Sequence, residues 1–180
     1  MTDKVNIDKG IEDWDAKDLR SDRTKPIQLE VYTDGSYNSN FQVYGGGIVV
    51  IVEGYPDPLD LKVSGNKKEF STYANAAGEL LAAMQAIKLA VKLGATSLKI
   101  HHDYMGVRAW TLPKGVNGSW RPKVELTKAY AAYVNSARVN HGLLIDFVHV
   151  KAHKGDALNN RADALAKEAV RECIKSLGIS

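Results

Sequence analysis

The sequence predicts an α/β fold in which helices cover the faces of a five-stranded sheet. Three β-rich segments follow one another near the start, and helical and strand-like segments then alternate. The spacing of the apolar residues changes from strand-like to helical after the third segment. Strands joined by short turns pair antiparallel, whereas strands joined through a helix pair parallel. The order βββ-α-β-α-β-α therefore indicates a mixed sheet.

The first three segments form the predicted antiparallel part. Residues 28–34 (QLEVYTD) are β-rich and end in an Asp-Gly-Ser turn signal. Residues 45–52 (GGGIVVIV) are a nearly continuous apolar run of strand length. We expect a third strand at 59–64 that resumes at 69–73 after a break near Gly65.

The rest of the chain alternates between helices and strands. Within residues 77–93, the apolar side chains of Leu80, Met84, Ile87 and Val91 recur at helical spacing, and Gly94 follows as a helix stop. The later elements are predicted as a strand at 97–103, a short helix to Trp110, a helix at 124–139, a strand at 143–150 and a helix at 159–176. The strand-helix-strand units make this part of the sheet parallel.

Composition limits the class of protein. The chain has 180 residues, of which 44% are hydrophobic and 25% charged, as in one ordinary globular domain. It lacks an apolar run near the ~20 residues of a membrane helix, so no membrane partner is expected. A single cysteine, Cys173, excludes an intramolecular disulfide and favours the cytoplasm. The net charge of +3 permits a nucleic-acid partner without requiring one.

The first 25 residues differ from the remainder. They contain seven acidic and six basic side chains but few apolar ones. Such a segment buries little surface, so we interpret residues 1–25 as a charged tail or linker, with Trp14 as its one candidate anchor. Residues 26–180 are then expected to form the folded domain.

Four acidic residues stand at predicted element boundaries. Asp34 and Asp103 end strands, while Glu79 and Asp163 lie early in helices. Taken singly, each has an ordinary explanation in turn chemistry or in the helix dipole. Together they can meet beyond the carboxyl ends of neighbouring strands. Clustered carboxylates suit Mg²⁺ or Mn²⁺, and two such ions can support both oxygens of a phosphodiester displacement.

Four segments together resemble the type 1 ribonuclease H family. They are TDGS (Thr33–Ser36), GELLAA (Gly78–Ala83), HHDY (His101–Tyr104) and VKAHKGDALNNRADALA (Val150–Ala166). The resemblance spans roughly residues 28–172 and implies the ribonuclease H-like fold, a mixed five-stranded sheet with strand 2 antiparallel, flanked by helices. The family is usually monomeric. The run DYMG is similar to a variant in bacterial enzymes of the Gram-positive type.

The resemblance also implies the reaction and its residues. The family's metal-binding catalytic carboxylates fall on Asp34, Glu79, Asp103 and Asp163, and its loop histidine, which assists proton transfer or product release, falls on His153. The implied activity is hydrolysis of the RNA strand of RNA–DNA hybrids with two Mg²⁺ ions, or Mn²⁺ in their place. It leaves 5′-phosphate and 3′-hydroxyl ends.

Recognition of a hybrid requires contacts to 2′-hydroxyl groups and to phosphates. The resemblance points to four amides for these contacts: Asn75, Asn38, Asn40 and Asn159. Each is also a common turn or helix-cap residue. The family's long basic protrusion is shortened here, and residues 105–128 form a basic stretch with five bases, Lys123 among them, and one acid, together with Trp110 and Trp120. This stretch either follows the DNA phosphates or is a solvated loop held by tryptophans.

Three alternatives compete with a hybrid-cleaving enzyme. The same fold could serve as a non-catalytic RNA–DNA hybrid-binding module, although all four acids are present. The acids could act on another nucleic acid, as in integrases and resolvases, but the ten-residue spacing from His153 to Asp163 argues against this. Zinc is disfavoured because strand alternation places His101 and His102 on opposite faces.

Overall fold

A computed structural model describes residues 24–113, 116, 120–151 and 155–178 of the chain. Its elements, in chain order, are β1 (Gln28–Asn38), β2 (Val43–Val52), β3 (Leu59–Gly65), α1 (Lys68–Ser71), α2 (Asn75–Leu93), β4 (Ser97–His102), α3 (Gly106–Ala109), α4 (Glu125–His141), β5 (Leu144–His149) and α5 (Ala157–Ser176). None of the helices in these residues is long and apolar enough to cross a bilayer. The proposed tail, with Trp14, lies outside the described residues.

The five strands form one mixed sheet in the order β3-β2-β1-β4-β5. β2 pairs antiparallel with both β1 and β3. β4 lies between β1 and β5 and is parallel to each of them. The predicted mixed sheet with an antiparallel second strand is therefore confirmed, and β1 is its central strand.

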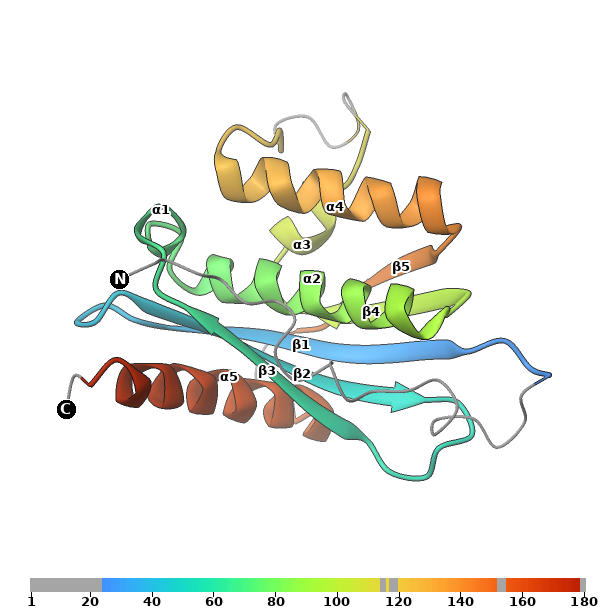
Figure 1. Ribbon diagram of the computed structural model, residues 1–180, viewed down its shortest axis with the longest axis horizontal. Helices are drawn as coiled ribbons and strands as arrows, with labels where there is room; N and C mark the ends of the chain where they lie inside the picture. The colour runs from blue at the N-terminus through green and yellow to red at the C-terminus, as the bar shows by residue number, and fades with distance from the viewer. Residues whose placement is uncertain (1–23, 114–115, 117–119, 152–154, 179–180) are drawn as a thin grey trace.

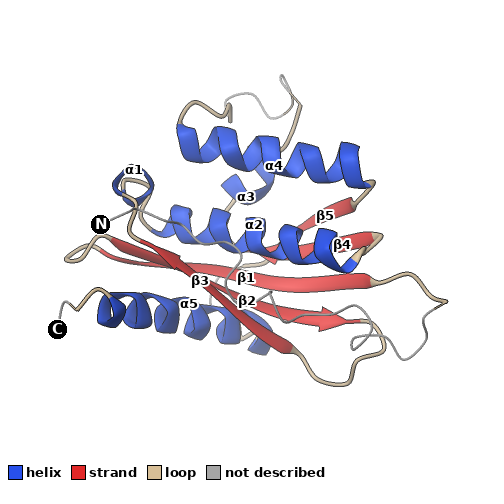
Figure 2. Ribbon diagram, in the orientation of Figure 1, coloured by secondary structure: helices blue, strands red, loops and turns tan. Residues whose placement is uncertain are grey.

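Helices cover the two faces of the sheet unequally (Figure 1, Figure 2). α2 packs over β1 and β2, and α3 and α4 lie on the same side of the sheet. Of the helices that the structure describes, only α5 lies on the opposite face, against β1, β2 and β3. The main apolar core fills the space between the sheet and α2, with Val31, Ile48 and Leu80 fully buried. Of the apolar residues that predicted this helix, Leu80 and Ile87 are fully buried, whereas Met84 and Val91 are partly buried against the core.

Three glycines of β2 let both helices approach the sheet closely. A Cβ atom on Gly47 would lie 2.1 Å from the Ala162 carbonyl oxygen of α5. One on Gly46 would lie 2.7 Å from the Gly78 carbonyl oxygen of α2. Gly45 likewise meets α5, 2.8 Å from the carbonyl oxygen of Ala166. The run GGG therefore brings backbone against backbone on both faces of β2.

One predicted strand segment is wrong. Residues 69–73 do not resume the third strand, because β3 ends at Gly65 and the short helix α1 follows. Phe70 points into the core and packs against Tyr44, with ring centroids 6.3 Å apart. The Ser71 hydroxyl donates to the carbonyl oxygen of Gln42, 2.6 Å away. A single helical turn achieves both contacts.

The observed end of β1 and the observed start of α2 differ from the predicted ones, and this changes where two acids lie within their elements. β1 continues through Asp34 to Asn38, so this carboxylate lies within a central strand and not at its end. α2 begins at Asn75, which places Glu79 beyond the first turn of its helix. β4 ends at His102, so Asp103 directly follows the strand that was predicted to end with it. Both shifts move acids away from solvent.

Candidate active site

Asp34 is held where β1 runs beneath α2. It lies opposite Gly47 in the antiparallel pairing with β2, and its side chain is buried, with 8% exposure. The backbone N–H of Gly35 donates to Asp34 Oδ1 at 2.7 Å. This bond fixes the carboxylate beside its own strand.

The same N–H group also binds Glu79, from the facing helix. Gly35 N lies 3.0 Å from Glu79 Oε1. A Cβ atom on Gly35 would come within 2.5 Å of the Asn75 carbonyl oxygen, so only glycine allows this approach of β1 and α2. Glu79 is 3% exposed, and its Oε2 atom has no hydrogen-bond partner among the described residues. A buried carboxylate oxygen without a partner is costly, which indicates a place for a ligand.

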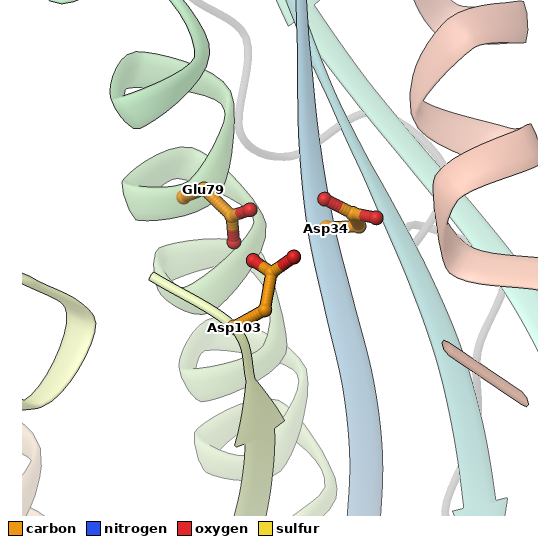
Figure 3. A group of neighbouring side chains, drawn as sticks. All are labelled: Asp34, Glu79 and Asp103. Carbon is orange, nitrogen blue, oxygen red and sulfur yellow. The ribbon is translucent and has the colours of Figure 1, made fainter. Parts of the chain in front are cut away.

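Asp103 completes a group of three carboxylates. One carboxylate oxygen each from Asp34, Glu79 and Asp103 lies within 4.8 Å of the others. Figure 3 shows the three side chains converging from β1, α2 and the end of β4. Three chain segments far apart in sequence therefore place their acids at one point.

Burial and mutual repulsion disfavour the ionised forms of these acids. Burial raises the pKa of Asp34 to about 6, and the charges of Asp103 and Asp163 act in the same direction. Burial also raises the pKa of Glu79 well above its usual value, and the neighbouring Asp34 and Asp103 reinforce the shift. A bound cation would reverse this preference by favouring the charged carboxylates.

Asp163 lies at the same cavity but outside the tight cluster. It projects from α5 and its Oδ2 forms an ion pair with Lys167 Nζ at 2.7 Å. The cavity has a volume of about 400 Å³. Its lining residues are Asp34, Gly35, Ser36, Asn75, Ala76, Glu79, Asp103, Tyr104, Asp163 and Lys167. All four predicted carboxylates therefore face one cavity, and three of them share a possible cation position.

The donor set fits a hard divalent cation. All of the clustered ligand atoms are carboxylate oxygens, which Mg²⁺ and Mn²⁺ prefer. Within the part of the chain that the structure describes, Glu79 Oε2 has no hydrogen-bond partner. The histidines of β4 do not join the cluster. His102 is fully buried, whereas His101 stacks on Tyr32 and pairs with Glu30 at 2.5 Å. The described residues thus offer oxygen ligands and no zinc-like set.

The predicted substrate contacts are scattered. Asn75 lines the cavity and is exposed. The Asn38 side chain accepts hydrogen bonds from the backbone of Asn40 and Phe41, which is the geometry of a turn. Asn159 is buried at 5% exposure, and its Oδ1 atom has no hydrogen-bond partner in the residues that the structure describes. Lys123 is exposed before α4, and Asn40, Asn159 and Lys123 lie outside the lining of the cavity. His153 lies outside the described residues.

Sequence reasoning missed three parts of the site. Gly35 supplies one N–H group to two carboxylates, for which TDGS was the available signal. Lys167 reaches Asp163 one helical turn away, a spacing readable in the sequence. Tyr104 forms part of the cavity wall and packs near Trp110 and Trp120, whose rings lie 5.1 Å apart. The two tryptophans of the basic stretch therefore contact each other.

Fold and site together define a class: α/β proteins whose central strand and adjoining helix carry an acidic, cation-suited centre. Comparison with known proteins narrows this class. The family model for RNase H matches residues 26–171. The chain belongs to the RNase H family, and it is a ribonuclease H enzyme.

Several curated relatives have similar length. A ribonuclease H from Paracidovorax citrulli is 31% identical over 156 residues, covering 82% of this chain and 97% of the relative. A ribonuclease HI from Caulobacter vibrioides is 28% identical over 155 residues, covering 81% and 94%. The Gram-positive-like character of DYMG stays a prediction.

Solved structures share the fold. The N-terminal RNase H domain of a Mycobacterium tuberculosis protein superposes with a TM-score of 0.63 at 21% identity, covering 84% of this chain and 99% of that domain. LC11-RNase H1, solved in complex with an RNA/DNA hybrid, superposes with a TM-score of 0.61 at 20% identity, covering 82% and 99%. At these identities the likeness establishes the ribonuclease H-like fold alone.

Proposed function

We propose that this enzyme is an endonuclease that hydrolyses the RNA strand of RNA–DNA hybrids with two divalent cations, Mg²⁺ or Mn²⁺. The products would be 5′-phosphate and 3′-hydroxyl ends. One observation carries the proposal: one oxygen from each of three carboxylates lies within 4.8 Å of the others, and a buried oxygen of Glu79 has no hydrogen-bond partner in the described part of the chain. Membership in the RNase H family supplies the reaction class.

In this mechanism the residues of the chain would bind the cations and keep the carboxylates in position. Asp34, Glu79 and Asp103 would hold the cations. Asp163, on α5, would become a further ligand once a cation replaces Lys167 as the partner of its carboxylate. When bound, the ions would acidify an attacking water and stabilise charge on the departing 3′ oxygen. Gly35 keeps Asp34 and Glu79 fixed before the cations arrive. His153 would assist proton transfer or product release.

Substrate selection would rest on contacts to the RNA 2′-hydroxyl groups. Asn75 is the strongest candidate because it is exposed and lines the cavity that holds the acids. Asn38, Asn40 and Lys123 would contact the backbone farther away, and Asn159 would become reachable only if its surroundings shift, since it is buried. The hybrid complex of LC11-RNase H1 supports this substrate class. We take the enzyme to act as a cytoplasmic monomer, with residues 1–25 outside its catalytic domain.

The test uses end-labelled RNA–DNA hybrid, duplex RNA and duplex DNA, each with and without Mg²⁺. We expect cleavage of the RNA strand in the hybrid alone, only with Mg²⁺, and fragments with 5′-phosphate ends. His153→Ala should lower turnover less than Asp34→Asn does. Cleavage of duplex DNA, or cleavage in EDTA, would contradict the proposal.

The second candidate is a non-catalytic hybrid-binding module. It predicts binding of the hybrid without cleavage at any Mg²⁺ concentration. The buried cluster argues against it: burial and the neighbouring carboxylates raise the pKa of Glu79, so ionising it is unfavourable without a cation, and a binding module gains nothing from that arrangement.

A further inference from the structure

Two histidines lie side by side directly beneath the turn that carries Asp103. His102 ends β4 and His149 ends β5, and the two residues are partners in the parallel register. Their ring centroids are 5.8 Å apart, at a steep angle. Neither residue lines the cavity of the carboxylates, so neither has a place in the mechanism above.

Each histidine binds a backbone carbonyl of the turn. His149 Nε2 lies 3.2 Å from the carbonyl oxygen of Asp103. His102 Nδ1 lies 2.9 Å from the carbonyl oxygen of Tyr104. A carbonyl oxygen only accepts hydrogen bonds, so both ring nitrogens act as donors. Consecutive carbonyls of the turn are thus held by two neighbouring strands.

The turn needs such support because the strand ladder stops before it. The last β4 residue in register is His102, and the N–H of Val150 donates to its carbonyl oxygen at 2.8 Å. Asp103 itself lies beyond the ladder. Its carboxylate must nevertheless point at Asp34 and Glu79, which are fixed by Gly35.

Core packing alone does not account for His102. The residue is fully buried, and with Nδ1 donating to Tyr104 its Nε2 atom finds no hydrogen-bond partner among residues 24–113, 116, 120–151 and 155–178. An unsatisfied buried polar atom costs about 1–3 kcal/mol, which an apolar side chain would avoid. The bond to the turn gives this histidine a role that leucine could not fill.

We propose that His102 and His149 are positioning residues that hold the 103–104 turn, and so set the affinity of the carboxylate cluster for its divalent cations. The proposal rests on the proposed function, because it assumes that Asp103 is a cation ligand. The histidines act through the hydrogen bonds that their ring N–H groups donate, and the proposal does not depend on their charge. Other side chains that position metal ligands change cation affinity by about tenfold when removed.

The test measures Mn²⁺ affinity by calorimetry on the full chain, with no substrate present. His149 is exposed, so its variants should fold. His149→Met should weaken Mn²⁺ binding about tenfold. His149→Gln, whose amide nitrogen occupies the position of Nε2, should restore affinity to within about twofold of the original protein. His141→Met, at the exposed end of α4, is the matched control and should leave affinity unchanged.

A second pair of variants separates positioning from stability. His102→Leu should retain the thermal midpoint but weaken Mn²⁺ binding, whereas His102→Asn, which keeps a donor near Nδ1, should weaken it less. Hybrid cleavage should show the same shift in the Mg²⁺ concentration for half-maximal rate, with the rate at saturating Mg²⁺ little changed.

The outcomes distinguish failure of the proposed function from failure of the positioning role alone. If the original protein binds no Mn²⁺, the proposed function and this inference both fail. If it binds Mn²⁺ but His149→Met and His149→Gln match it, or weaken it equally, the positioning role alone is overturned. Weakening by Met with recovery by Gln supports it.

Discussion

The carboxylates of two regions of this molecule have opposite surroundings: in one they are paired with basic side chains, and in the other they face one another. Beside β3, the acids and bases are paired: Lys62 contacts Glu172 at 2.6 Å, and Arg161 contacts Asp60 at 2.8 Å. In the cluster beneath α2, three carboxylates face one another, and burial raises the pKa of two of them.

The contrast between the two regions shows that the carboxylate cluster, and not the surface ion pairs, lowers the stability of the metal-free fold. Exposed ion pairs fasten α5 to β3 and contribute little, typically 0–1 kcal/mol each. The buried carboxylates lower the stability of the metal-free protein, because ionising them without a counter-charge is unfavourable. Only a ligand from outside the chain can reverse that cost. The predictions below test this contrast, beginning with the largest effect.

Removing one clustered charge should abolish activity while raising stability. Asp34→Asn keeps an oxygen for the Gly35 N–H but loses a cation ligand. We expect turnover of the hybrid to fall by roughly 10³-fold or more and the metal-free thermal midpoint to rise by a few degrees. Single-turnover cleavage and thermal melts in EDTA measure the two quantities.

Asp60→Asn is the matched control, because it removes an exposed carboxylate that is already paired with Arg161. It should leave turnover near that of the original protein and cost at most about 1 kcal/mol. Activity retained in Asp34→Asn would move the site elsewhere.

Mg²⁺ should stabilise the folded chain substantially. A ligand that binds only the native state adds about 2.7 kcal/mol at one hundred times its dissociation constant. For a chain of this size the midpoint should rise by about 5–10 °C. Thermal melts with increasing Mg²⁺ measure the shift, and Asp34→Asn should lose most of it. An equal shift in both proteins would indicate binding at another place.

The pH dependence of stability should reveal the raised pKa of Asp34. In the folded protein Asp34 holds its proton up to about pH 6, whereas the unfolded chain releases it near pH 4. The folded state therefore binds more protons in this interval, and its stability falls as the pH rises from about 4 to 6. Burial lowers the pKa of His102 to about 4, which has the opposite effect on stability.

Comparing the original protein with Asp34→Asn separates these contributions. The stability advantage of the variant, from urea melts in EDTA, should grow by on the order of 1–3 kcal/mol between pH 4 and pH 7. A constant difference across this range would show that the Asp34 pKa is not raised.

The ion pair of Asp163 should give the smallest effect. Lys167 competes with a cation for this carboxylate, at 2.7 Å. Lys167→Met should strengthen Mn²⁺ binding by about twofold to fivefold, since the pair is half-exposed and weak. Calorimetry measures the change. Weaker binding in the variant would mean that Lys167 supports the site and does not compete with it.

Much of the fold could be predicted because its signals are local. The apolar run of β2 and the helical spacing of Leu80, Met84 and Ile87 each predict one element, and short turns or intervening helices fix the pairing. The segment at 69–73 failed because a brief β-prone run with one buried aromatic fits a strand as well as a helical turn. Only the contact of Phe70 with Tyr44 decides between them.

The site was predictable as a set of residue types but not as a geometry. Four acids at element boundaries, with the family resemblance, indicated a cation centre. That Asp163 pairs with Lys167, or that Gly35 binds two carboxylates, depends on how α5 and α2 cross the sheet. The histidine pair depends on the register of β4 with β5, which no local pattern contains.

The glycine run of β2 has a consequence beyond close packing. This strand supplies none of the acids, yet α2 and α5 rest on it from opposite sides, and those helices carry Glu79 and Asp163. A methyl group added at Gly47 would displace α5, and one at Gly46 would displace α2, each by the width of the added atom. The distance across the cavity between Glu79 and Asp163 therefore depends on the absence of side chains at the glycines of β2, a strand that does not line the cavity.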